Sequence, residues 1–79
     1  MKEKAALRLT EKELAALRGE LAEVSEELHC AYRAFNSAVE KDLICSSVYE
    51  INMLCARHTY ILREIKRLNA AQQRKEEGE

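Results

Sequence analysis

Apolar residues in the first half of the chain recur at alternating steps of three and four residues. This spacing places them along one face of a helix and is typical of a coiled-coil seam. Leu7 extends the seam one heptad upstream, which allows a helix start anywhere from Lys4 to Thr10. Thr10 and Glu13 match a capping box, so we place the start there. The pattern predicts a first helix over residues 10–35. The seam consists of Leu14, Leu17, Leu21, Val24, Leu28, Ala31 and Phe35.

A second apolar ladder follows a polar segment. Residues 36–42 read NSAVEKD, which is poor in helix formers and has the length of a helix–helix connection. Ser37 with Glu40 forms a second capping box, and Asp42 is an alternative N-cap. We expect the second helix over residues 43–70 and a frayed tail over residues 71–79, which lack large apolar side chains. The ladder comprises Ile44, Val48, Ile51, Cys55, His58, Leu62 and Ile65.

The short link predicts an all-α fold, an antiparallel two-helix hairpin of coiled-coil type. Folding back about Val39 sets an acidic segment, residues 11–28, beside a basic one, residues 57–67. Exposed ion pairs contribute only about 0–1 kcal/mol each, so this match supports the topology without causing it.

The second helix carries more apolar surface than one partner covers. Leu54, Ile61 and Leu68 form a further row at heptad spacing, and leaving such side chains exposed forgoes about 1.5–3 kcal/mol each. A wide apolar face is typical of a helix between two neighbours. We therefore expect a symmetric homodimer, a four-helix bundle whose dimer seam is formed by these three residues.

Composition restricts the class of protein. The 79 residues include no Pro and two Gly and are 34% charged, which favours a single helical domain. The net charge of -1 gives no general attraction to nucleic acid or to anionic membranes. Three scattered Cys without a Cys-x-x-Cys spacing indicate a reducing compartment. No apolar run could form a signal peptide or a membrane span, so we expect a soluble, cytoplasmic protein.

Signatures of catalysis are missing from the sequence. It holds no Ser-His-Asp order, Gly-rich phosphate loop or His-Glu-x-x-His motif, so we expect neither an enzyme nor a cofactor. Cys55 and His58 stand three residues apart, which is half of a metal site that a dimer could complete. The favoured interpretation is that both are seam residues, with Cys acting as a small hydrophobe. A non-enzymatic adaptor or regulator that binds another protein is the expected function.

A basic stretch towards the end of the second helix raises an alternative. With Tyr60 it could contact phosphates, which would make the protein a nucleic-acid-associated accessory protein. The same basic side chains could instead form ion pairs with the acidic first helix. The stretch comprises Arg57, Arg63, Lys66, Arg67, Arg74 and Lys75.

Four segments between residues 31 and 67, namely AYRAFN, DLI, VYEIN and YILREIKR, follow a recognisable order. In these segments the sequence resembles the YaaL-like family of small bacterial proteins, whose function is uncharacterised. The resemblance spans about residues 25–67 and implies a cytoplasmic helical protein with no known substrate or cofactor. It directs attention to Phe35, Asn36, Tyr49, Glu50 and Tyr60 as candidate interaction residues.

Overall fold

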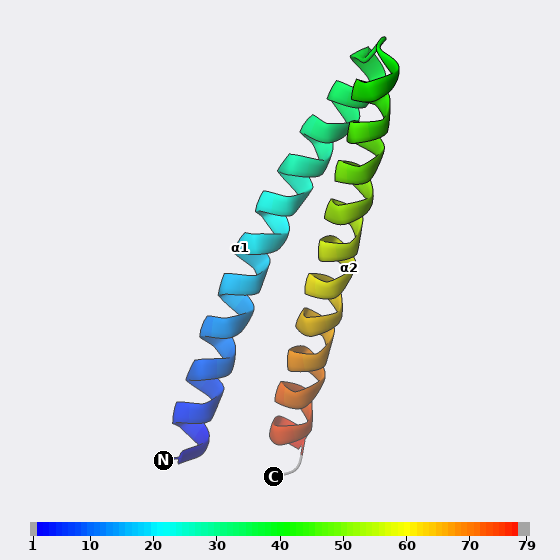
Figure 1. Cartoon of the computed structure of the whole chain (residues 1–79). Helices are drawn as coiled ribbons and strands as arrows, with labels where there is room; N and C mark the ends of the chain where they lie inside the picture. Colours follow the sequence, from blue (N-terminus) through cyan, green and yellow to red (C-terminus); the bar gives the residue numbers. More distant parts are fainter. Residues whose placement is uncertain (1, 78–79) are drawn as a thin grey trace.

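The chain folds into two long antiparallel helices. The computed structural model describes the backbone of residues 2–77 and the side chains of residues 8–74. Helix α1 spans Lys2–Ser37 and helix α2 spans Lys41–Glu77, and both chain ends lie at the end of the rod opposite the loop (Figure 1). The rod measures 59 × 15 × 13 Å. The predicted helical hairpin, folded back about Val39, is confirmed.

Both helices are longer than the sequence pattern predicted. Helix α1 begins at Lys2 and not at Thr10, because the residues before Thr10 are mostly strong helix formers and none of them is Gly or Pro. Thr10 therefore lies inside the helix, and its interpretation as a cap is wrong. Helix α2 likewise continues to Glu77 through Ala, Gln, Arg, Lys and Glu. The last two residues of the predicted tail lie outside the described residues.

The connection is shorter than predicted, at residues 38–40. The Ser37 hydroxyl donates to the backbone carbonyls of Arg33 (3.0 Å) and Ala34 (3.3 Å), so Ser37 ends α1 and does not cap α2. The carbonyl of Glu40 accepts from the amide of Ile44 at 3.0 Å, which places Glu40 at the N-cap of α2. Asp42 lies in the first turn of α2, where the helix dipole favours a carboxylate.

The seam predicted for α1 is confirmed. Leu14, Val24 and Ala31 are buried, and four neighbours on the same face are half-buried. The apolar cluster extends along most of the rod, so the core is a single strip between the two helices. The half-buried residues are Leu17, Leu21, Leu28 and Phe35.

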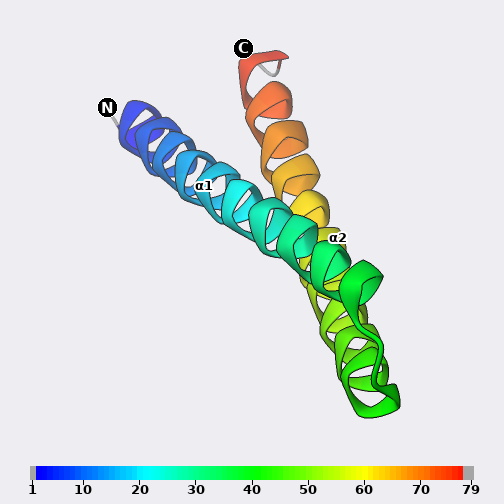
Figure 2. The same cartoon turned by 90° about the horizontal axis from the view of Figure 1, so that it is seen from above.

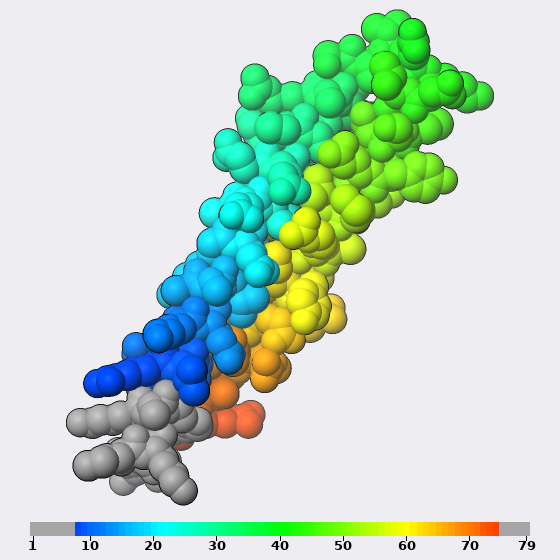
Figure 3. All heavy atoms as spheres, turned by 60° about the vertical axis from the view of Figure 1, so that its left-hand side comes forward, coloured from blue at the N-terminus to red at the C-terminus, as the bar shows by residue number. Residues whose placement is uncertain are grey.

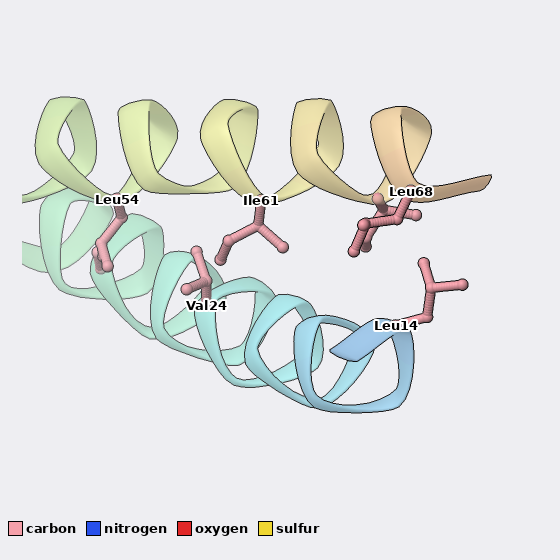
Figure 4. Packing of buried hydrophobic residues seen from close by; sticks show 7 residues of the cluster. Leu14, Val24, Leu54, Ile61 and Leu68 are labelled. Carbon is pink, nitrogen blue, oxygen red and sulfur yellow. The ribbon is translucent and has the colours of Figure 1, made fainter. Parts of the chain in front are cut away.

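The seam predicted for α2 is confirmed at Ile44, Ile51, His58 and Ile65, which are buried or half-buried, but the seam positions between them are wrong by one residue. Leu54, Ile61 and Leu68 are only 1%, 3% and 8% exposed within the single chain. Figure 4 shows these three side chains projecting from α2 towards Val24 and Leu14 of α1. They are therefore core residues of the hairpin and are not free to form the predicted dimer seam. Val48 and Cys55, which the sequence placed on the seam, are exposed.

Side-chain size sets the spacing of the helices. Near the loop, the buried positions include the small Ala31 and Ser47, whereas towards the chain ends they are Leu14, Ile65 and Leu68. Small residues allow the backbones to approach, and larger ones hold them apart. The helices accordingly lie closest near the loop and diverge towards the termini (Figures 1 and 2).

Candidate interaction surface

A second apolar stripe follows the solvent side of α2. Tyr49, Met53 and Tyr60 are 76%, 56% and 60% exposed, and Ala56 between them is also exposed. Their steps of four, three and four residues repeat the spacing of the seam. At 100° per residue the stripe is directed on average about 140° away from the seam side chains of α2. We call Tyr49, Met53, Ala56 and Tyr60 the outer stripe.

The structure separates the five interaction residues predicted from the sequence. Tyr49, Glu50 and Tyr60 lie on or beside the outer stripe. Phe35 is half-buried on the α1 seam, and Asn36 is exposed in the last turn of α1. Sequence reasoning missed Met53 and Ala56. The sequence could have revealed them, because residues 46, 49, 53, 56 and 60 are also spaced by three and four residues and so form a second stripe away from the seam.

Polar side chains border the outer stripe on both sides. Glu50 and Arg57 follow one edge at a spacing of seven residues, and Asn52 and Thr59 follow the other. Arg57 Nη1 lies 3.8 Å from Glu27 Oε2 of α1, an exposed pair that links the two helices. The Thr59 hydroxyl donates to the carbonyl of Cys55 at 3.0 Å. An apolar stripe with polar edges is typical of a helix-packing surface.

Charges lie at the two ends of the stripe. Asp42 precedes it in the first turn of α2, and Arg63 and Arg67 follow it. Arg67 donates through Nε and Nη2 to Glu64 Oε2 at 3.0 and 2.8 Å. This hydrogen bond and the charge of Glu64 raise the pKa of Arg67, with a smaller contribution from Glu13. The stripe thus begins next to a carboxylate and ends next to guanidinium groups.

A segment near the start of α2, residues 43–56, is poor in charge. Between residues 43 and 56, Glu50 is the one charged residue, whereas a third of the whole chain is charged. Leu43, Val48 and Val39 are all exposed in the loop half of the hairpin, together with Tyr32 on α1. Exposed apolar side chains concentrated in one region of a surface typically mark a site of association.

The described residues show no cluster suited to metal binding. Within the described part of the chain, no group of three or more His, Cys, Asp and Glu side chains could hold a metal ion. Cys55 is exposed while His58 is half-buried, so they do not share a surface or a core position. Thr59, Leu62, Arg63 and Lys66 line a shallow depression on α2. The face in Figure 3 shows two packed helices without a deep cleft.

Comparisons with known proteins identify no relative. No protein family, no curated protein and no solved structure matches the chain. The resemblance to the YaaL-like family therefore stays a prediction. Among the described residues, neither helix is long and apolar enough to cross a membrane.

Proposed function

We propose that this protein is a non-enzymatic interaction module, an adaptor or regulator that binds other helices through the outer face of α2. The outer stripe carries the proposal. Helix α2 is apolar on two faces, of which α1 covers one, and a helix with two apolar faces is typical of one that lies between two neighbours.

The recognition would follow the physics of helix packing. Tyr49 and Tyr60 would bury large aromatic surfaces at little cost in side-chain entropy, and Met53 would adapt to the shape of its partner. Glu50 and Arg57 would set the orientation of the bound helix, because rim charges act mainly on specificity and on the rate of association. The partner helix would add to the existing hairpin without changing its core.

Affinity capture from native cell extract tests this function. We expect proteins retained by the wild-type chain to be lost with the Tyr49→Ala/Tyr60→Ala variant, because these side chains dominate the exposed apolar surface of the stripe. Tyr32→Ala removes an exposed tyrosine from α1 and serves as the matched control. An identical set of retained proteins for all three chains, each with the same helical circular dichroism, would refute the proposal.

The alternative is a nucleic-acid accessory protein that uses the basic end of α2. Its support is weaker, because the net charge of -1 gives the chain no general attraction to nucleic acid. The side chain of Lys75 lies outside the described residues. Binding of labelled RNA or DNA that weakens steeply with salt would favour this alternative, since phosphate contacts release counterions.

The cysteines are consistent with a reducing compartment such as the cytoplasm. Cys30, Cys45 and Cys55 are all free and exposed. Exposed thiols persist in a reduced state where glutathione and thioredoxin maintain them, so we propose a cytoplasmic site of action.

A further inference from the structure

Charge complementarity along the outer stripe points to its partner: we infer that a second copy of this chain binds there, with the two α2 helices antiparallel about a two-fold axis. The inference rests on the proposed function and names the helix that occupies the stripe. It differs from the dimer expected from the sequence, because Leu54, Ile61 and Leu68 stay in the core of each hairpin.

The stripe has the same spacing in both directions along the helix. Extended to its charged ends, it runs in steps of 4, 3, 4, 3, 4, 3 and 4 residues, which like any heptad spacing reads identically backwards and so permits antiparallel pairing with a second copy. An isologous interface requires such a self-complementary surface, because every contact between two residues occurs twice, once on each side of the two-fold axis. The residues are Asp42, Ser46, Tyr49, Met53, Ala56, Tyr60, Arg63 and Arg67.

Side-chain sizes fit the antiparallel register. The two-fold axis then passes between Leu54 and Cys55, which sets Tyr49 against Tyr60 of the second copy. Met53 meets Ala56 of the second copy, so a long side chain faces a small one, as interdigitating layers require. Paired aromatic rings contribute about 0.5–1.5 kcal/mol beyond the area that they bury.

Charges select this register over its neighbours. On one edge Glu50 faces Arg57 of the second copy, and at the ends Asp42 faces Arg67 of the second copy. Each of these pairs occurs twice. Within each chain these arginines also pair with Glu27 and Glu64, and a guanidinium, with five N–H donors, can bind a second carboxylate. A shift of one heptad in one direction would set Arg57 against Arg57, and a shift in the other direction would set Glu50 against Glu50. Like charges in contact oppose association, so only the unshifted register pairs Glu50 with Arg57 on the charged edge.

The other edge also pairs favourably. Asn52 faces Thr59 of the second copy, and an amide and a hydroxyl can hydrogen-bond. The paired segment, residues 42–67, is about 38 Å long at 1.5 Å per residue. Two helices in contact over this length, with tyrosines that each bury about 150–250 Å² when fully covered, form an interface of substantial size.

Sedimentation equilibrium of the full chain and of two charge reversals tests the inference. At micromolar concentration we expect the wild type to have twice the 9.1 kDa mass of one chain. Glu50→Arg sets like charges against Arg57, and Arg57→Glu sets like charges against Glu50, so each variant alone is expected to be monomeric. Mixed in equal amounts, the two variants regain opposite charges in both pairs between positions 50 and 57 and are expected to form a heterodimer.

Controls separate this inference from the proposed function. Glu26→Arg reverses an exposed charge on α1 away from the stripe and should leave the dimer intact. A monomeric wild type, or a dimer that neither charge reversal disturbs, would overturn the inference. A monomer that still loses captured proteins on Tyr49→Ala/Tyr60→Ala would assign the stripe to a different protein. Dimerisation without such captured proteins would support the inference and not the wider function.

Discussion

Gly19 is a position where the protein is less stable than its fold allows. It lies within α1 at an exposed site, and a Cβ built on it would meet no atom within 4 Å. Glycine loses more backbone entropy than alanine when a helix forms, and the described residues contain no positive φ that would require it. We therefore expect Gly19→Ala to raise the free energy of unfolding by about 0.5–1 kcal/mol.

Urea denaturation at a fixed protein concentration measures this change, since self-association would otherwise shift the midpoint. Ala22→Gly, an exposed change in the opposite direction one turn away, is expected to lower the stability by a similar amount. Equal or reduced stability of Gly19→Ala would indicate that Gly19 is needed for a contact outside the single chain.

At the scale of the element, the phase of α2, meaning which of its faces packs against α1, is open to direct test. The structure puts Leu54 in the core of the hairpin and Cys55 on the surface, whereas the sequence prediction placed Cys55 on the hairpin seam and Leu54 at the dimer seam. Leu54→Ala is expected to cost about 2–5 kcal/mol, because it leaves a cavity between the helices. Cys55→Ala is expected to change stability by no more than about 0.5 kcal/mol. Thermal unfolding followed by circular dichroism distinguishes them.

Because Leu54→Ala could prevent folding of so small a protein, Ile61→Val offers a milder measurement, with an expected loss of about 0.5–1.5 kcal/mol. Leu62→Ala is its counterpart beside the core, where the side chain is only half-buried. A greater loss from Cys55→Ala than from Ile61→Val would contradict the phase of α2.

The sequence could predict α1 but not the phase of α2, for a physical reason. Apart from Leu9 and Tyr32, the large apolar residues of α1 lie on one face, so its periodicity allows a single interpretation. In α2, apolar residues occupy nearly every face between residues 43 and 62, and two heptad ladders fit equally well. Ser47 is buried and belongs to the seam of α2, but it is a polar residue, so a pattern of apolar residues does not include it. The same abundance of apolar positions concealed the outer stripe.

At the scale of the whole molecule, the antiparallel register fixes the shape of the dimer. The two-fold axis crosses α2 between Leu54 and Cys55, nearer the loop than the chain ends. The loop halves therefore overlap, and the charged halves of the two rods extend in opposite directions. From the axis to residue 77 is about 34 Å at 1.5 Å per residue, which gives the dimer a length of about 70 Å. A single rod measures 59 Å.

Small-angle X-ray scattering measures this length in solution. Since the outer stripe is directed on average about 140° from the seam of α2, the four helices should form a flat array and not a square bundle. We expect a maximum dimension near the length of about 70 Å derived for the dimer. The cross-section should be wider in one direction than in the other. A particle of dimeric mass that is no longer than one rod would mean that the hairpins overlap fully. That arrangement would set the two-fold axis away from Leu54 and break the pairing of Glu50 with Arg57, so it would exclude the register even if the dimer itself were real.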